Sequence, residues 1–208
     1  MGDKNYTRAY LSEAQEICGA IDSIQVEKIV EVLLKTRTIG GRIFFLGCGG
    51  SAGNASHAVN DFRKIAEIEC YAPTDNVSEL TARTNDEGWN TVFVQYLVTS
   101  KISDKDTIFV LSVGGGDKEN NISANIVSAL ELAKERNTNI VGIVGRDGGY
   151  TGLVADACVI VPTVNKETIT PHTESFQAVI WHLIVTHPKI LKNNIEKTTY
   201  DNLVASGL

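Results

Sequence analysis

The chain has 208 residues, of which 43% are hydrophobic and 21% are charged, and its formal net charge is -6 at pH 7. This composition is typical of a folded protein with one core, so we expect a single domain. The acidic balance argues against general affinity for nucleic acid, which requires a basic patch. No apolar run approaches the ~20 residues that span a bilayer, and the N-terminus does not resemble a signal peptide. We therefore expect a cytoplasmic protein, without membrane contact, that binds a small molecule.

Two helices, or one helix bent near Asp22 and Ser23, are predicted before the first strand. Apolar residues follow helical spacing from residue 7 to about residue 35, with a break near Asp22. We assign residues 1–40 to this helical extension, residues 41–187 to an α/β core and residues 188–208 to a polar tail. The extension carries more apolar surface than one sheet face needs. We therefore expect it to pack on another subunit as well.

The core alternates strands, glycine- or serine-rich loops and helices. We expect strands at 43–46, 67–71, 107–111, 140–144 and 158–161, and helices at 51–66, 76–100 with an interruption near 84–89, 122–137, 150–155 and 173–186. Continuous apolar strands separated by helices predict a parallel five-stranded sheet flanked by helices, which is a three-layer α/β fold. Ligands in such folds bind outside the carboxyl ends of the strands, where both glycine-rich loops lie.

The first glycine-rich loop follows the strand at 43–46 and leads into a helix. Its glycines let the backbone approach a ligand, and the helix start offers N–H groups and a positive dipole end to an anion. Ser51 lies near that start. His57 and Asp61 follow it four residues apart, so both side chains can point into one space. The loop and the pair together predict a ligand site with an acid/base or metal-binding function.

The second loop runs from Ser112 through three glycines, and Ser123 lies before the next helix. Hydroxyls and exposed amides without a lysine suit a monophosphate held by neutral hydrogen bonds. A nucleotide loop of the form GxxxxGK[ST] is absent. The alternative interpretation is a plain strand-to-helix connection, which such a turn often provides.

Two of the four histidines lie on predicted helices close to an acid. His57 precedes Asp61, and Glu174 precedes His182 by eight residues, roughly 80° around one helix. If the two helices face each other, the four side chains form a mixed nitrogen and oxygen set suited to zinc or to proton transfer. Purely structural histidines are the alternative.

Several motifs are shared with a known family. They are GCGGSAGNASHAVNDF, TNDEG, VGIVGRDGG and an acid eight residues before a helical histidine. On these motifs the chain resembles, over about residues 7–187, the sugar isomerase (SIS) domain family and within it the phosphoheptose isomerases. The resemblance implies a flavodoxin-like strand order and a homotetramer. It also implies conversion of sedoheptulose 7-phosphate to D-glycero-D-manno-heptose 7-phosphate in bacterial heptose precursor biosynthesis.

The resemblance also implies roles for individual residues. Asp61 and His182 would transfer protons, and Zn2+ would be held by His57, Asp61, Glu174 and His182. Asp86 would contact a sugar hydroxyl, and Ser51, Ser112 and Ser123 would bind phosphate or hydroxyls. The remaining substrate contacts would come from Cys48, Gly49, Gly50, Val113, Gly114 and Glu174.

The chain departs from the family pattern at several of these positions. Cys48 stands where the family usually has asparagine, Asp61 replaces glutamate and Glu174 replaces glutamine. The phosphate loop also contains an insertion, DKENNI. Three functions therefore stay open: this isomerase, an isomerase of another sugar phosphate, and a non-catalytic SIS-domain regulator that binds a sugar phosphate or a replication initiator. Two acid and imidazole pairs favour an enzyme, because a binding module has no physical need for them.

Overall fold

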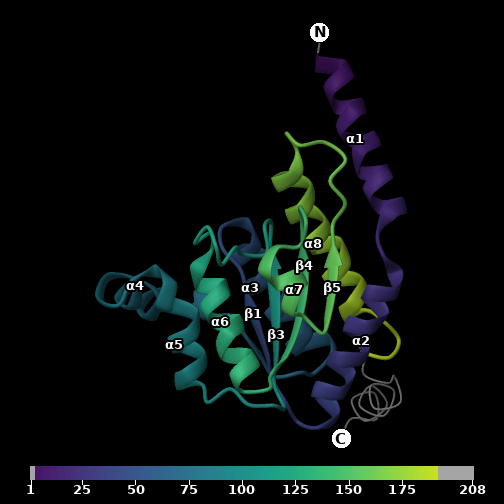
Figure 1. Cartoon of the computed structure of the whole chain (residues 1–208). Helices are drawn as coiled ribbons and strands as arrows, with labels where there is room; N and C mark the ends of the chain where they lie inside the picture. The colour runs from purple at the N-terminus through teal and green to yellow at the C-terminus, as the bar shows by residue number, and fades with distance from the viewer. Residues whose placement is uncertain (1–2, 192–208) are drawn as a thin grey trace, which may run out of the picture.

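A computed structural model describes residues 3–191 of the chain. In chain order its elements are α1 (Asp3–Ala20), α2 (Ser23–Thr38), β1 (Ile43–Leu46), α3 (Gly50–Ile65), β2 (Cys70–Tyr71), η1 (Pro73–Asp75), α4 (Val77–Asp86), η2 (Trp89–Thr91), α5 (Val92–Thr99), β3 (Thr107–Ser112), α6 (Ala124–Glu135), β4 (Asn139–Val144), α7 (Gly149–Val154), β5 (Ala157–Ile160) and α8 (Ile169–Val185). The strands form one parallel sheet in the order β2-β1-β3-β4-β5 (Figure 1). The predicted three-layer α/β fold with a flavodoxin-like order is confirmed.

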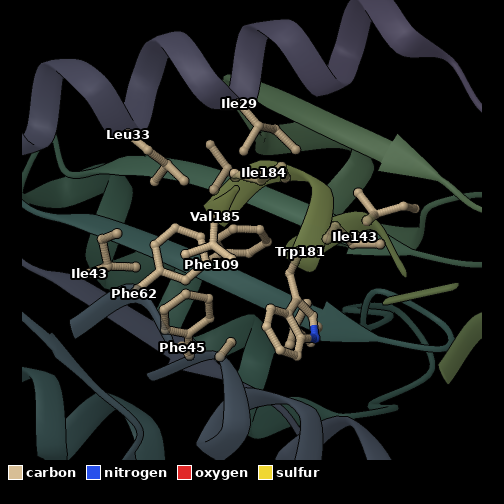
Figure 2. Close-up of a cluster of buried hydrophobic side chains, with 14 of the residues drawn as sticks. Ile29, Leu33, Ile43, Phe45, Phe62, Phe109, Ile143, Trp181, Ile184 and Val185 are labelled. Atoms are coloured by element: carbon tan, nitrogen blue, oxygen red, sulfur yellow. The ribbon is translucent and has the colours of Figure 1, made fainter. Parts of the chain in front are cut away.

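The sheet separates two hydrophobic clusters, because successive residues of a strand point to opposite faces. Phe45 belongs to the cluster under α2, α3 and α8, whereas Phe44 belongs to the cluster under α5 and α6. Figure 2 shows the first cluster, in which Phe62, Phe109 and Trp181 are completely buried. This packing fixes α3 and α8 side by side on one face of the sheet, and both carry predicted site residues.

Two element boundaries differ from the prediction for local reasons. The second strand was expected at 67–71 but covers only Cys70–Tyr71, because Glu67 adopts a left-handed φ of 52° and the Ile68 amide donates to the Phe62 carbonyl. Helix α8 begins at Ile169, four residues before the predicted start. Pro171 lies in its first turn, where a missing N–H costs no helical hydrogen bond.

The N-terminal extension consists of two helices, as predicted, and Asp22 caps the second. Its carboxylate accepts hydrogen bonds from the Ile24 and Gln25 amides at 2.9 and 3.3 Å. Helix α1 projects from the sheet (Figure 1), and among its described side chains only Ile17 is buried. Most of its surface is therefore unused within one chain.

Glu13 ties α1 to the start of α8. Its carboxylate accepts hydrogen bonds from Asn165 at 2.8 Å, from Thr168 at 2.8 Å and from His172 at 2.9 Å. Hydrogen bonds from Asn165, His172 and Thr168 hold the pKa of Glu13 below its ordinary value. Tyr10 stacks on His172 with 4.2 Å between the ring centroids. The first turn of α8 is thus held by polar contacts as well as by the core.

The beginning of the predicted tail packs back on α2. Arg37 donates hydrogen bonds to the Ile190 carbonyl at 2.6 Å and the Lys189 carbonyl at 3.0 Å. The rest of the tail, residues 192–208, lies outside the described part of the chain. Within residues 3–191, none of the helices combines the length and hydrophobicity needed to cross a bilayer.

Candidate active site

Three predicted site residues meet where α3 packs beside α8. Oδ2 of Asp61 lies 3.7 Å from Nε2 of His57 and 3.7 Å from Nε2 of His182. The two imidazole rings meet edge to face, with 5.3 Å between centroids. One nitrogen or oxygen of each side chain lies within 4.8 Å of the others. The structure thus brings His57, Asp61 and His182 together, as the helical spacing predicted.

Neighbouring groups orient this cluster. His182 Nδ1 lies 2.7 Å from the Ala178 carbonyl, which can only accept, so Nδ1 carries a proton and Nε2 is the nitrogen that faces the cluster. The Asn60 amide donates to Oδ1 of Asp61 at 2.8 Å, which leaves Oδ2 to face the histidines. Buried Trp181 packs against both imidazole rings. The free nitrogen and oxygen atoms therefore point toward one another.

Glu174 lies beside the first loop, outside this group of three. A Cβ on Gly50 would overlap the Glu174 carboxylate, so only glycine allows this approach. The Asn54 amide holds α8 here by donating to the Glu174 carbonyl at 2.8 Å and to the Gln177 side chain at 3.0 Å. Glu174 is therefore positioned at the start of α3, and its role as a metal ligand stays a prediction.

The first loop presents the start of α3 without a capping side chain. Gly49 precedes the helix with a positive φ of 60°, and Ser51 is buried in the first turn. Cys48 accepts a hydrogen bond from Asn125 of α6 at 3.2 Å, which links the two predicted ligand loops. Burial raises the pKa of Cys48, although this hydrogen bond partly opposes the rise. The thiol is therefore uncharged at neutral pH, and its contact with substrate stays a prediction.

The second loop divides into a rigid part and a separate hairpin. The Ser112 hydroxyl accepts a hydrogen bond from the Gly115 amide at 3.1 Å, and the Val113 carbonyl accepts one from the Gly145 amide at 3.1 Å. The inserted DKENNI segment closes on itself through a bridge between Asp117 and Ile122. Ser123 follows in a left-handed conformation as the N-cap of α6, and its side chain makes no capping bond.

The rigid part interlocks with the loop before α7. The Gly115 carbonyl accepts hydrogen bonds from the Thr151 amide at 2.9 Å and hydroxyl at 2.7 Å, and the Gly116 carbonyl accepts one from the Tyr150 amide at 2.7 Å. A Cβ on Gly115 would overlap the Gly148 carbonyl, and one on Gly149 would overlap the carbonyls of the second loop. The Gly115 and Gly116 carbonyls and the Tyr150 and Thr151 amides are therefore hydrogen-bonded to one another and are not available to a ligand.

Asp86 lies apart from the other candidates. It ends α4, is exposed, and accepts a hydrogen bond from the Asn85 amide at 2.7 Å. Figure 1 shows α4 projecting on the side of the sheet away from α8. Within one chain Asp86 does not reach the cluster, so its contact with a sugar hydroxyl stays a prediction that would require another subunit.

The sequence profile of the SIS domain matches residues 9–145. The chain belongs to the SIS domain family. The phosphoheptose isomerase of Rhodospirillum rubrum is 32% identical over 150 residues, which cover 70% of this chain and 74% of that protein. The lincomycin biosynthesis protein LmbN of Streptomyces lincolnensis is 33% identical over 164 residues, which cover 76% of this chain but only 59% of that protein.

Solved structures of phosphoheptose isomerases share this fold. The structure of phosphoheptose isomerase from Neisseria gonorrhoeae superposes with a TM-score of 0.75 at 24% identity, over 87% of this chain and 95% of that one. This likeness establishes the SIS-domain fold for nearly the whole described chain.

Sequence reasoning missed three side chains that organise this SIS-domain site. Asn54 donates a hydrogen bond to α8, and Asn125 donates one to Cys48 of the first loop. The Trp181 ring packs against the imidazoles of His57 and His182. Asn54 and Asn125 each lie in the first or second turn of a helix that follows a glycine-rich loop. Their position in the sequence could therefore have indicated that the two asparagines belong to the site. The role of Trp181 could not be read in this way, because it depends on how α8 packs against α3.

Proposed function

We propose that this SIS-domain protein is an aldose–ketose isomerase that converts sedoheptulose 7-phosphate to D-glycero-D-manno-heptose 7-phosphate in bacterial heptose precursor biosynthesis. Relatives named phosphoheptose isomerase support this reaction. The observation that carries the proposal is Asp61 Oδ2, which lies 3.7 Å from Nε2 of both His57 and His182. Enolisation requires a base and a proton carrier side by side, and this cluster provides both.

The chain's own groups can perform the proton transfers. Asp61 would remove the proton from the carbon beside the substrate carbonyl, which produces an enediol. His182 would carry a proton between the two oxygens through Nε2 while that nitrogen is not bound to metal, because its Nδ1–H is held by the Ala178 carbonyl. Return of the first proton to the neighbouring carbon completes the exchange of ketose and aldose. After one turnover Asp61 and His182 are back in their starting protonation states, and the product has the same number of protons as the substrate.

Zn2+ is part of this proposal, and the donor set fits it. Two imidazoles and one carboxylate are ligands that zinc takes, and catalytic zinc sites commonly have three protein ligands and an open position. His57, Asp61 and His182 would hold the ion, with Glu174 as the further ligand predicted from the sequence. Bound zinc would polarise the substrate oxygens. The fixed tautomer of His182 supports metal binding, because a hydrogen bond at Nδ1 commonly orients a ligating histidine.

The direct test is product analysis by NMR after incubation with sedoheptulose 7-phosphate, together with metal content on the same preparation. We expect the heptose 7-phosphate to form in zinc-loaded protein and its formation to stop after chelation. Absence of any product from zinc-loaded protein would contradict the proposed reaction.

A second candidate is the same chemistry on a different sugar phosphate. Cys48, Asp61 and Glu174 depart from the pattern of the phosphoheptose isomerases, and a relative of equal similarity is named for lincomycin biosynthesis, which supports this alternative. A panel of ketose and aldose phosphates of five to eight carbons would decide between them. A higher kcat/KM for another member of the panel would reassign the substrate and keep the enediol mechanism.

We also propose a cytoplasmic homotetramer in which subunits cover exposed apolar surface. On α1, Tyr6 and Leu11 are 65% and 59% exposed, and on α8 Val179 and Leu183 are 54% and 51% exposed. Val179 and Leu183 flank His182, so a neighbouring subunit on that face would also close the site. Light scattering that gives a monomer at micromolar concentration would contradict this assembly.

A further inference from the structure

Arg146 is a cation beside the second loop with no role in the chemistry above. It follows the last residues of β4 with a left-handed φ of 53°, which is uncommon for a residue other than glycine. Its backbone is fixed on both sides, because Gly145 packs against Thr173 of α8 and the Gly148 amide donates to the Gly145 carbonyl at 3.0 Å. The direction in which this side chain leaves the backbone is therefore determined by the fold.

The side chain of Arg146 extends across Gly114. A Cβ built on Gly114 would lie 3.8 Å from Cδ and 4.0 Å from Nε of Arg146. The guanidinium is exposed and makes no hydrogen bond or ion pair with any residue that the structure describes. Lys118, which is also close to this loop in sequence, is paired with Glu131, and the Asp147 carboxylate accepts from the Gly149 amide. Arg146 is thus an unpaired cation over the loop.

The loop itself has little else to offer an anion. Gly114, Gly115 and Gly116 carry no hydroxyl, the Gly115 amide already donates to Ser112, and Ser123 lies beyond the inserted hairpin. The Ser112 hydroxyl already accepts from the Gly115 amide, although it can still donate its own proton. A phosphate monoester held here by neutral groups alone would have few partners. A guanidinium presents several N–H donors in a planar fork that matches phosphate oxygens.

We propose that Arg146 binds the phosphate group of the substrate, and so supplies the charge-assisted hydrogen bonds that the glycine-rich second loop lacks. This inference rests on the proposed isomerase function for the identity of the substrate. It concerns binding, because the phosphate is remote from the carbons that exchange protons. Arg146 is therefore a specificity residue for phosphorylated sugars.

Two substitutions of Arg146 and one control variant distinguish the effect of losing its charge from the effect of disturbing the fold. Arg146→Asn removes the charge and keeps a residue that tolerates a left-handed φ, and Arg146→Lys keeps a single charge. Arg136→Asn is the control, because Arg136 is an exposed arginine that follows α6 at the opposite end of the sheet. In Arg146→Asn we expect KM for sedoheptulose 7-phosphate to rise by about 10- to 100-fold while kcat stays within ~3-fold, since a charged hydrogen bond to the remote phosphate is lost. Arg146→Lys should recover part of the loss, and Arg136→Asn should match wild type.

A measurement without turnover keeps this inference distinct from the proposed function. Inorganic phosphate is titrated at constant ionic strength, and its dissociation constant is taken from the rise in melting temperature. We expect this dissociation constant to rise about tenfold or more in Arg146→Asn and to stay unchanged in Arg136→Asn. Equal affinity in wild type and Arg146→Asn, or no phosphate binding by wild type, overturns the assignment. A wild-type protein that binds phosphate through Arg146 but does not isomerise the heptulose phosphate refutes only the proposed substrate.

Discussion

The fold holds two of its carboxylates, Asp106 and Asp61, in opposite ways. At the N-terminal end, the Asp106 side chain is 3% exposed and accepts hydrogen bonds from the Arg42 guanidinium and amide and from Ser103, all between 2.9 and 3.2 Å. On α3, Asp61 faces two imidazoles at 3.7 Å, beyond hydrogen-bonding distance. A fully bonded carboxylate stabilises the fold, whereas Asp61 keeps an oxygen free for a ligand or a proton. The comparison separates a carboxylate whose partners all lie within the fold from one that can still accept a ligand.

The largest effect is expected from removing the free carboxylate or its partner. Asp61→Asn and His182→Gln should each reduce kcat by roughly 10²- to 10⁴-fold, the usual contribution of general acid–base catalysis. The double variant should lose little more, because residues that act as one unit are not additive. Melting temperatures of the metal-free proteins should change little, since Asp61 lies 3.7 Å from both imidazoles and its hydrogen bond comes from exposed Asn60. Near-normal turnover in both single variants would contradict the catalytic assignment.

The opposite result is expected at the N-terminal end of the sheet. Asp106→Ala should lower the free energy of unfolding by about 3 kcal/mol, because it leaves the Arg42 charge and the Ser103 amide without their partner. The specific activity of the folded fraction should equal that of wild type. Denaturant titrations and kinetics on the same preparation would measure both. A loss of activity with unchanged stability would contradict the purely structural role of Asp106.

The stability that Asp106 contributes should depend on pH. Burial opposes its ionisation, but hydrogen bonds from the Arg42 side chain and from the Arg42 and Ser103 amides outweigh burial and lower its pKa. A carboxylate with a lowered native pKa stabilises the fold above its unfolded value of about 4, and this stability is lost as pH falls through the native pKa. The stability gap between wild type and Asp106→Asn should therefore be constant from pH 7 to about 5 and shrink below about 4. A gap independent of pH would contradict the shift.

Glu174 provides a smaller test at the carboxyl end. Gly50→Ala places a methyl group where the Glu174 carboxylate lies, so we expect the carboxylate to move and kcat/KM to fall by about tenfold. Gly53→Ala is the matched control, because its Cβ would enter open space in the same helix. The control should keep full activity and gain about 0.5–1 kcal/mol of stability. Equal activity in both variants would remove Glu174 from the working site.

The smallest effect is expected at Ser112. Ser112→Ala should raise KM by about fivefold and leave kcat nearly unchanged, because one neutral hydrogen bond contributes on the order of 1 kcal/mol. The effect should be smaller than that of Arg146→Asn. Steady-state kinetics on both variants would rank them, and an unchanged KM in Ser112→Ala would exclude its hydroxyl from phosphate binding.

Much of the fold could be predicted from the sequence because its signals are local. Buried runs such as Phe44 and Phe45 predict parallel strands, and Asp22 marks the break between the first two helices. The predicted start of α8 and the predicted length of β2 were wrong, because Pro171 lies inside the first turn of α8 and Glu67 adopts a left-handed φ. Boundaries of this kind depend on single residues whose conformation is set by their neighbours in space.

The candidate site was predictable only in part. The four-residue spacing of His57 and Asp61 is local, and the histidine on α8 could be paired with them by assuming that two helices meet. The approach of Glu174 to Gly50 and of Arg146 to Gly114 depends on how α8 and the end of β4 pack against the loops. No spacing along the chain encodes such contacts between segments that are distant in sequence.

The interlocked glycines of the second loop and the loop before α7 constrain how this scaffold can be re-engineered. Because the backbone of each loop leaves no room for a side chain at Gly115 or at Gly149 of the other, the two loops form a single matched module. A chimera that imports residues 112–116 from a relative must therefore import residues 145–151 with them. The hairpin closed by Asp117 and Ile122 lies outside this module, so its length can be changed independently.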